Sequence, residues 1–373
     1  MPNETLARAR EAQNDEFYTQ FHDIEKEVNA YMEYNPDVFR DKTILLPCDD
    51  PEWSNFTKYF ALNFEYFGLK KLISTCYASE ETPQAHPITF ESNAPQFDAE
   101  KSVTNGKILV LERKAKSLKR INFKNLPWKY LEGNGDFCSQ EICKLRDEAD
   151  FIITNPPFSL FRKFLTWILE GKKQFLTLGS MNAISYIEVF PLIKDNIIWL
   201  GVESGAKEYL TPTGENQKMG NTCWFTNIEH GRRHQPLPLM PMADNLKFSR
   251  HKEIKGKDNY DHYDNYDAIE VPYTDAIPSD YDGVMGVPIS FIDKYCPEQF
   301  DIIGITKTWF GMANKTYPEQ IQVDKNGEES RVTKLNDGAT IRRETIPIGE
   351  TYYIVDNNYY TQVYARILIR KKQ

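Results

Sequence analysis

The 373-residue sequence predicts an α/β protein whose first part forms a parallel sheet with helices on both faces. Two observations support this fold class. Short β-rich runs alternate with helical patterns up to about residue 226, which is the arrangement that a parallel sheet requires. Beyond His230 the periodicity fades, and Pro, Asn, Tyr and Asp become frequent. We therefore expect two domains, residues 1–228 and residues 229–373, the second of them irregular and β-rich.

The first elements follow from local patterns. Residues 43–47 (TILLP) and 72–77 (LISTCY) predict strands, and residues 107–111 predict a further strand whose place in the sheet is open. Between the first two, Ser54 is suited to cap a helix that stops at Gly68. The aromatic residues of this helix share one stripe: Phe56, Tyr59, Phe60, Phe64 and Phe67.

The later elements of the first domain centre on residues 151–154 (FIIT), which predict a buried strand that ends at Asn155. An amphipathic helix is expected over residues 159–170, and a helical stretch near residues 186–194. Three more strands are expected: 175–178, 197–202 and 222–226. Near the end of the chain, residues 351–369 alternate Tyr, Ile and Val and predict strands in the second domain.

The net charge of −9 at first argues against a nucleic-acid partner, but the charge is unevenly distributed. Residues 258–282 contain eight acidic residues and no Lys or Arg, so that this tract supplies nearly all of the excess. Residues 101–129 contain nine basic residues and one acid. Such a run could follow a phosphate backbone, although solvated surface is an equally good interpretation of any one cluster. Taken alone, the acidic tract could be disordered.

Several classes of protein are disfavoured by composition. No apolar run approaches the roughly 20 residues of a membrane helix, and the first twenty residues lack a signal peptide's apolar core, so a cytoplasmic protein is expected. The six cysteines form no CxxC pair and predict packed, reduced thiols. His230 and His234 have no third ligand nearby in sequence, so no metal is expected.

The tetrapeptide Asn155-Pro156-Pro157-Phe158 carries the most chemical information. Ligands of open α/β sheets bind at the carboxyl ends of strands, where this segment is expected. Its prolines are stiff and donate no N–H, which leaves the Asn155 side-chain oxygen and the Pro156 carbonyl as rigid acceptors. Two such acceptors suit an exocyclic amine that becomes positively charged as it attacks, and Phe158 is suited to stack on a flipped base. An ordinary proline turn is the alternative.

In this context the tetrapeptide resembles the (Asn/Asp/Ser)-Pro-Pro-(Tyr/Phe/Trp) motif of amino-methyltransferases that use S-adenosylmethionine. Further segments resemble the EcoRI-type adenine-specific DNA methyltransferases: Asp15-Glu16-Phe17-Tyr18-Thr19-Gln20, Cys48-Asp49-Asp50-Pro51 and Gly283-Val284-Met285-Gly286-Val287-Pro288. The resemblance covers about residues 13–304, is weakest over residues 78–129, and leaves the stretch after Ile305 as an expected expansion. It implies a Rossmann-like methyltransferase sheet with a C-terminal target-recognition domain for DNA. Because the acidic tract lies within the resembling segment, the resemblance implies that this tract is folded.

The resemblance also implies a cofactor site. Phe17, Tyr18 and Thr19 match the motif that closes over the methionine part of S-adenosylmethionine. Asp49 and Asp50 stand where relatives have a Gly-rich turn with an acidic residue; the usual GxG is absent, and which aspartate contacts the cofactor is open. Asp136 and Phe137, in Gly135-Asp136-Phe137, match the element that recognises the cofactor's adenine, with a simple turn as the alternative.

The expected reaction is direct methyl transfer to the N6 amine of a flipped adenine in double-stranded DNA, with Asn155, Pro156, Pro157 and Phe158 as catalytic residues. Expected DNA contacts come from two basic clusters: Lys114, Lys116, Lys119, Arg120, Arg232 and Arg233. A monomer is expected, and a cognate restriction endonuclease is a possible second component of the same system. The alternatives are methylation of cytosine N4, methylation of a protein glutamine amide, and DNA binding without turnover.

Overall fold

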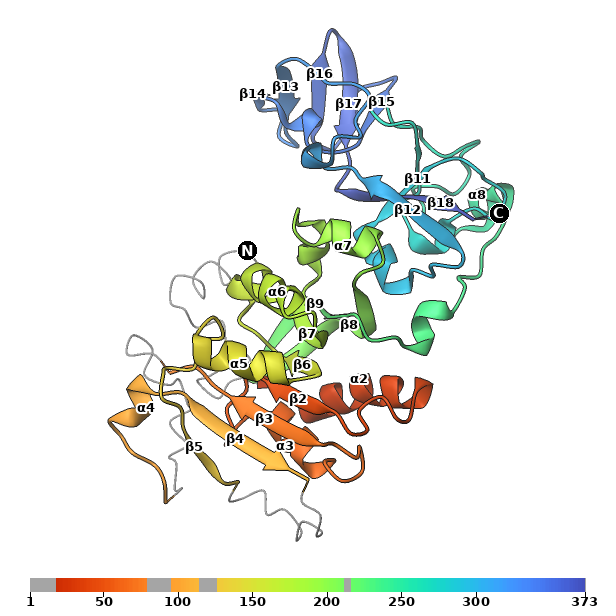
Figure 1. Ribbon diagram of the computed structural model, residues 1–373. Helices are drawn as coiled ribbons and strands as arrows, with labels where there is room; N and C mark the ends of the chain where they lie inside the picture. The colour runs from red at the N-terminus through yellow and green to blue at the C-terminus, as the bar shows by residue number, and fades with distance from the viewer. Residues whose placement is uncertain (1–17, 79–94, 114–125, 211–215, 373) are drawn as a thin grey trace. The chain divides into compact units, whose positions relative to one another are not determined.

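The computed structural model describes four stretches of the chain: residues 18–78, 95–113, 126–210 and 216–372. The chain forms two compact units (Figure 1). Unit 1 comprises residues 1–181 and 198–231, and unit 2 comprises residues 182–197 and 232–373. Among the described residues, we find no helix with the length and apolar character needed to cross a membrane.

Within the described residues, a nine-stranded mixed sheet forms the centre of unit 1, in the order β1-β8-β9-β7-β6-β2-β3-β4-β5. The strands have these bounds: β1 (Tyr18–Thr19), β2 (Thr43–Leu46), β3 (Lys71–Thr75), β4 (Lys107–Glu112), β5 (Trp128–Tyr130), β6 (Phe151–Thr154), β7 (Gln174–Ser180), β8 (Trp199–Leu210) and β9 (Asn216–Thr226). The α/β class is confirmed, and the strand expected over residues 107–111 is β4, beside β3.

The expectation of a parallel sheet holds only for the four central strands β3, β2, β6 and β7. The other strands pair antiparallel with their neighbours. The physical reason is clearest for β8 and β9, which are separated by residues 211–215 only. A connection this short can join antiparallel strands but cannot make the crossover that a parallel pair needs.

Helices cover both faces of the sheet, as expected. Their bounds in unit 1 are: α2 (Phe21–Tyr34), α3 (Asn55–Leu62), α4 (Lys101–Thr104), α5 (Gln140–Glu148) and α6 (Phe161–Glu170). On one face, α2 and α3 share a buried core with alternate strand residues such as Ile44 and Ile153. Leu45 and Ile152 point to the opposite face and are also fully buried. On that face the ring of Phe161 in α6 contacts Phe225, at 4.9 Å between centroids.

Helix α3 forms where the sequence predicts it. The Ser54 hydroxyl accepts hydrogen bonds from the backbone N–H groups of Phe56 and Thr57, which otherwise lack partners in the first turn. The five aromatic residues of the predicted stripe are all buried. The helix ends at Leu62, earlier than predicted, and Gly68 follows in the left-handed region, with φ of 63°.

Unit 2 contains two smaller antiparallel-rich sheets, in the orders β10-β11-β18-β12 and β14-β13-β16-β17-β15. Its elements have these bounds: α7 (Phe190–Lys194), α8 (Met242–Phe248), β10 (Ile269–Glu270), β11 (Met285–Pro288), β12 (Phe300–Ile305), β13 (Gln320–Val323), β14 (Glu329–Val332), β15 (Thr340–Arg343), β16 (Tyr352–Val355), β17 (Asn358–Gln362) and β18 (Arg366–Lys371). The strands predicted over residues 351–369 correspond to β16, β17 and β18, and β18 pairs with both β11 and β12.

The two units divide the chain close to the boundary expected at residues 228/229, with one difference. Residues 182–197, which lie inside the expected first domain, belong to unit 2. Aromatic packing explains this, because the ring of Phe190 in α7 lies 5.3 Å from that of Phe310 and 6.3 Å from that of Trp309. The helical stretch thus has its apolar partners far along the chain, which sequence order does not indicate.

Candidate active site

The carboxyl ends of the parallel strands bring several chain segments to one edge of the unit 1 sheet. Strand β2 leads to Asp49 and Asp50, β3 leads to Cys76, and β6 leads directly to Asn155. Because β4 runs antiparallel to β3, its first residue, Lys107, lies at the same edge. This is the edge at which open α/β sheets bind their ligands.

The segment Asn155-Pro156-Pro157-Phe158 leaves the sheet directly after β6, and its last residue begins the short 3₁₀ helix η2 (Phe158–Leu160). The predicted strand before it and helix after it are both present. Asn155 is half-buried and Pro156 is buried. The Phe158 side chain is only partly buried and packs against the core beneath α2 and α3. Part of its surface therefore remains accessible for stacking.

Asp49 is almost fully buried, and both of its carboxylate oxygens accept hydrogen bonds from hydroxyl groups. Ser54 Oγ donates to Oδ1 at 2.6 Å, and Thr154 Oγ1 donates to Oδ2 at 2.5 Å. The main chain of Asp49 is also held, because its carbonyl accepts from Ser74 Oγ at 2.5 Å and its N–H donates to the Thr75 carbonyl at 2.8 Å. Asp49 thus joins the ends of β3 and β6 to the start of α3.

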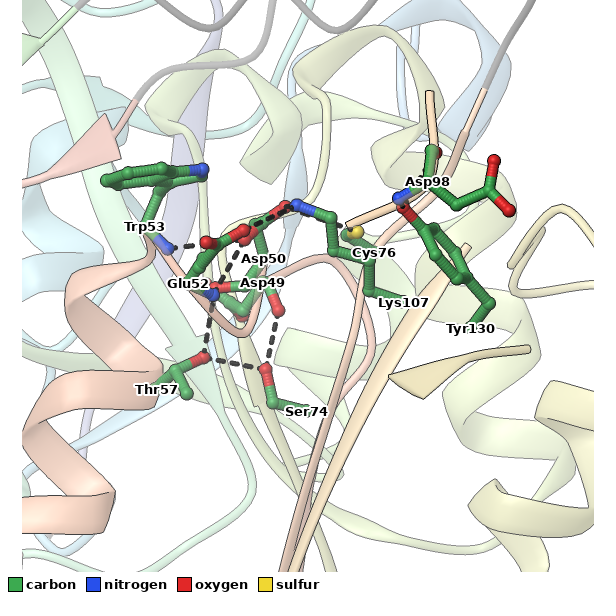
Figure 2. Close-up of polar contacts among 10 residues, drawn as sticks. All are labelled: Asp49, Asp50, Glu52, Trp53, Thr57, Ser74, Cys76, Asp98, Lys107 and Tyr130. Atoms are coloured by element: carbon green, nitrogen blue, oxygen red, sulfur yellow. Dashed lines mark hydrogen bonds and ion pairs between the residues drawn. The ribbon is translucent and has the colours of Figure 1, made fainter. Parts of the chain in front are cut away.

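Asp50 faces a different set of partners (Figure 2). Its Oδ1 accepts from the backbone N–H groups of Glu52 and Trp53, at 2.7 Å and 3.2 Å. Its Oδ2 pairs with Lys107 Nζ at 3.2 Å and accepts from Cys76 Sγ at 3.5 Å. Asp50 therefore shapes the turn before α3 and ties it to β3 and β4.

Lys107 is the buried cation of this edge, with a side chain only 1% exposed. Its ammonium also pairs with Glu52 Oε2 at 3.0 Å and lies 4.8 Å from the centre of the Trp128 ring. The Glu52 side chain is 16% exposed, so this carboxylate is the member of the group that reaches solvent. We refer to Lys107, Asp50 and Glu52 together as the Lys107 network.

The electrostatics of the Lys107 network favour its charged form. Burial alone would lower the pKa of the Lys107 ammonium, but the nearby carboxylates of Asp50 and Glu52 outweigh burial and raise that pKa above its ordinary value. Burial, with the charge of Asp50 added, raises the pKa of the Cys76 thiol well above its ordinary value, so Cys76 stays protonated. Two carboxylates against one ammonium leave the network with one negative charge in excess.

Gly135-Asp136-Phe137 packs against the end of β3. Gly135 has φ of 80°, and a Cβ atom added there would lie 2.2 Å from the Cys76 carbonyl oxygen, so only glycine fits. Asp136 Oδ1 accepts from the Cys138 N–H at 2.9 Å, which makes a local turn. The Phe137 ring is buried against Phe164, with centroids 5.2 Å apart. The cofactor contacts expected of Asp136 and Phe137 remain predictions.

The N-terminal motif reaches the same loop. Phe17 lies outside the described residues, whereas Tyr18 and Thr19 form β1, which pairs with β8. The Asn55 side chain at the start of α3 donates to the Thr19 carbonyl at 2.8 Å. Thr19 is therefore held beside the loop that carries Asp49 and Asp50. Trp224 and Phe225 of β9 are fully buried core residues.

The residues expected to contact DNA are only partly described. Lys114, Lys116, Lys119 and Arg120 lie outside the described residues. In unit 2, Arg232 pairs with Asp293 at 2.7 Å. Arg233 is only 9% exposed and donates to Asn196 Oδ1 at 2.8 Å, so its burial argues against direct contact with a phosphate. Lys107, one of the nine bases of the run at residues 101–129, is buried and does not belong to a basic surface.

The acidic tract at residues 258–282 is folded, as expected, and contains β10 and three buried tyrosines, Tyr260, Tyr263 and Tyr266. Its acids pair with bases of unit 2: Asp261 with Lys257 and Arg343, Asp264 with Lys315, Glu270 with Arg366, and Asp275 with Arg250 and His251. These bases of unit 2 therefore offset part of the negative charge of the tract.

The two histidines lie beside different protein groups. His230 is buried, with Nε2 2.9 Å from the Leu200 carbonyl, and His234 Nδ1 lies 2.9 Å from Glu298 Oε1. In the part of the chain that the structure describes, no group of three or more His, Cys, Asp or Glu side chains is arranged to hold a metal ion.

Sequence reasoning missed three residues of the site, namely Lys107, Glu52 and Thr154. Each carried a weak signal. Lys107 is the single charged residue at the start of an otherwise apolar strand, KILVL, and Thr154 is the hydroxyl residue directly before Asn155. Glu52 follows the two aspartates within the same turn.

Comparison with known proteins identifies relatives across nearly the whole chain. A model of the family described as adenine-specific methyltransferase EcoRI matches residues 5–372. The chain is 39% identical over 322 residues to Type II methyltransferase M.EcoRI of Escherichia coli, covering 82% of this chain and 90% of the relative. It is 34% identical over 314 residues to Type II methyltransferase M.MgeORF184P of Mycoplasma genitalium, covering 79% and 84% respectively. No solved structure shows a significant match.

The family match confirms the resemblance drawn from the motifs, and it extends that resemblance. The match continues to residue 372, so the stretch after Ile305, expected to be an expansion, is part of the family's pattern. The chain belongs to the EcoRI family of adenine-specific methyltransferases.

Proposed function

We propose that this protein transfers a methyl group from S-adenosylmethionine to the N6 amine of an adenine flipped out of double-stranded DNA at a short specific site. The observation that carries the proposal is the position of Asn155-Pro156-Pro157-Phe158, directly after β6 and beside the loop of Asp49 and Asp50. Membership of an adenine-specific family favours N6 of adenine over N4 of cytosine.

The catalytic role of the segment follows from its donors and acceptors. The Asn155 side-chain oxygen and the Pro156 carbonyl would each accept one hydrogen of the amine, which localises its lone pair and stabilises the positive charge that forms during attack. Phe158 would stack on the adenine ring, a contact worth about 1–3 kcal/mol, against the few kcal/mol needed to extrude a base. No nucleophilic cysteine is required.

The residues at this edge fit a cationic cofactor. S-adenosylmethionine supplies a methyl group bound to a positively charged sulfonium. The Lys107 network carries one excess negative charge, and Glu52 keeps part of its carboxylate accessible. The N-terminus of α3 offers the opposite polarity, which suits the cofactor's own carboxylate. We assign the remaining contacts to the residues carried over from the family: Phe17, Tyr18, Thr19, Asp50, Asp136 and Phe137.

The proposed division of labour follows the two expected domains. Residues 1–228, with a Rossmann-like sheet, would hold the cofactor and the catalytic segment, and residues 229–373 would recognise the target sequence. Contacts to phosphate would come from Lys114, Lys116, Lys119, Arg120 and Arg232. Because relatives are named Type II methyltransferases, we propose that the protein serves a restriction–modification system, as a monomer and without direct contact to the endonuclease.

A labelling experiment tests this function. Wild-type protein is incubated with isotope-labelled S-adenosylmethionine and plasmid DNA, and the nucleosides are separated by mass. Label in N6-methyladenine supports the proposal, whereas label in N4-methylcytosine or in neither base contradicts it. Label in a protein fraction instead would favour a glutamine amide as the acceptor, and specific DNA binding without any label would favour a non-catalytic protein.

Two further measurements address the site and the DNA surface. Asn155→Ala should abolish most turnover while calorimetric cofactor binding is retained, because Asn155 acts on the amine alone; unchanged turnover would remove it from the site.

DNA affinity should fall steeply with salt if the basic residues neutralise phosphates. A flat salt dependence would assign the basic clusters to ordinary solvated surface.

A further inference from the structure

Asp49 has an unusual position for a residue expected to bind a ligand. Its side chain is 4% exposed, and each carboxylate oxygen already accepts a short hydrogen bond from a hydroxyl group, Ser54 Oγ on one side and Thr154 Oγ1 on the other. Hydrogen bonds to an ionised carboxylate are roughly twice as strong as those between neutral groups. Because the side chain is also buried, a cofactor group has little access to this carboxylate.

The partner on the sheet side is the residue next to Asn155. Thr154 is fully buried at the end of β6, and its hydroxyl has two neighbours: it donates to Asp49 and accepts from the Cys48 N–H at 3.3 Å. The chain Cys48–Thr154–Asp49–Ser54 therefore fixes the last residue of β6 against the loop that precedes α3. The main-chain bonds of Asp49 to Ser74 and Thr75 hold the same loop to β3.

Asp50 is also buried, with a side chain 7% exposed, but its partners differ from those of Asp49. Its Oδ1 shapes the turn through backbone N–H groups, and its Oδ2 belongs to the Lys107 network, whose Glu52 reaches solvent. The two adjacent aspartates thus have different partners. Asp49 accepts from Thr154 at the end of β6. Asp50 pairs with Lys107, which also holds Glu52 (Figure 2).

We infer that Asp49 is a positioning residue that sets the place of Asn155 through Thr154, and that it is not a ligand of the cofactor. This inference rests on the proposed function, because it assigns Asn155 to the acceptor amine. A catalytic group misplaced by about 1 Å can lower a rate roughly 10²-fold. Loss of the Asp49–Thr154 bond should therefore lower kcat while cofactor affinity changes little.

The test compares substitutions at both ends of this bond. Asp49→Asn keeps the shape of the side chain and removes its charge, and Thr154→Val keeps the volume and removes the hydroxyl. Each should lower kcat by about 10- to 100-fold, with the calorimetric Kd for S-adenosylmethionine within about threefold of wild type. The double variant should lose little more than either single variant, because both remove the same link. Thr154→Ser keeps the hydroxyl and should restore most of the activity.

Thr226→Val is the matched control for Thr154→Val. Thr226 is equally buried, and its hydroxyl also donates one hydrogen bond, to the Phe175 carbonyl at 2.6 Å, and accepts one from a backbone N–H, that of Ile228 at 3.0 Å. Its bonds, however, lie at the amino end of β7, away from the catalytic segment. It should lower thermal stability about as much as Thr154→Val and leave kcat near wild type.

The possible results separate the inference from the proposed function. If Asp49→Asn raises the cofactor Kd as much as it lowers kcat, Asp49 is a cofactor ligand and the inference is wrong. If Thr226→Val lowers kcat as much as Thr154→Val, the loss reflects general destabilisation and the inference is also wrong. Failure of the wild-type protein to label N6-methyladenine would instead contradict the proposed function. Should Thr154→Val not fold, Asp49→Asn alone gives the same comparison of kcat with Kd.

Discussion

Each unit of the molecule buries a cation beside carboxylates, and the two clusters differ in the balance of their charges. In unit 1 the ammonium of Lys107 meets two carboxylates, Asp50 at 3.2 Å and Glu52 at 3.0 Å. In unit 2 the guanidinium of Arg366 meets one carboxylate, Glu270, at 2.6 Å, and Glu270 also accepts a hydrogen bond from the Tyr263 hydroxyl. The first cluster has an excess negative charge, and the second is neutral.

The two clusters also lie at different kinds of position in the fold. Arg366 and Glu270 lie on strands β18 and β10 of one sheet. Asp50 and Glu52 lie in a loop at the carboxyl edge of the unit 1 sheet, where ligands of α/β proteins bind. The charges of Arg366 and Glu270 cancel, so this pair stabilises the fold. The Lys107 network also stabilises the fold, but one of its negative charges is left to attract a ligand.

The largest effects should come from removing the two cations. Lys107→Met and Arg366→Met each leave buried carboxylates unpaired, which typically destabilises a protein by about 3–5 kcal/mol. We expect losses of this order for both in denaturant unfolding. Calorimetry should then separate them. Lys107→Met should raise the Kd for S-adenosylmethionine, because without the ammonium Asp50 and Glu52 repel each other and lose their fixed positions. Arg366→Met should leave the Kd unchanged.

The comparison fails in either of two cases. A Lys107→Met variant that binds the cofactor normally would make the Lys107 network a purely structural feature like its counterpart. An Arg366→Met variant with weakened cofactor binding would show that loss of stability alone changes the Kd.

The part of the site that local patterns encode could be predicted from the sequence. The Ser54 cap, the buried strand before Asn155 and the aromatic stripe of α3 depend on residues within a few positions of one another. The predicted parallel arrangement holds for the four central strands only, because alternation of strands and helices does not show in which direction the outer strands run. The place of β4 decides where Lys107 lies, so the Lys107 network was missed with it.

Buried charges are the second class of feature that the sequence hides. Glu27, on the polar-looking helix α2, is fully buried, and its carboxylate accepts from the N–H groups of Val202 and Glu203, about 175 positions away in sequence. Lys107 and Asp50 are separated by 57 positions. A charged residue in isolation predicts solvated surface, and only its distant partner, which the fold supplies, makes burial favourable.

The next largest effects should come from glycine substitutions beside the two clusters. An added Cβ would lie 2.2 Å from the Cys76 carbonyl oxygen in Gly135→Ala and 2.2 Å from the Tyr263 hydroxyl in Gly286→Ala. Each clash should lower stability by about 1–3 kcal/mol. Gly135→Ala should also weaken cofactor binding, because the added Cβ would collide with main-chain atoms beside the Lys107 network. Gly286→Ala should leave cofactor binding unchanged. Equal effects on the cofactor Kd would contradict this.

Alkaline pH should reduce the stability of both clusters. Burial, reinforced by Glu270, raises the pKa of Tyr263 well above its ordinary value of 10.0. The unfolded chain therefore releases this proton first, and stability falls as pH rises above about 10, by up to about 1.4 kcal/mol per pH unit. Deprotonation of Lys107 should likewise lower stability as pH rises, since the pKa of Lys107 is also raised. Unfolding midpoints of Tyr263→Phe measured across this range should show a shallower decline than wild type; an equal slope would contradict the assignment.

The smallest effect should come from an exposed ion pair of the same acidic tract. Arg250 and Asp275 lie 2.9 Å apart, but their side chains are 80% and 46% exposed, so solvent and salt screen their attraction. Arg250→Gln should therefore change the free energy of unfolding by about 1 kcal/mol or less, against the several kcal/mol expected for Arg366→Met. Denaturant unfolding of both variants should be measured at low and at high salt. The small effect of Arg250→Gln on the free energy of unfolding should shrink as salt is added, and that of Arg366→Met should not. A loss as large as that of Arg366→Met would mean that burial is not what distinguishes the neutral cluster of unit 2 from the surface pairs around it.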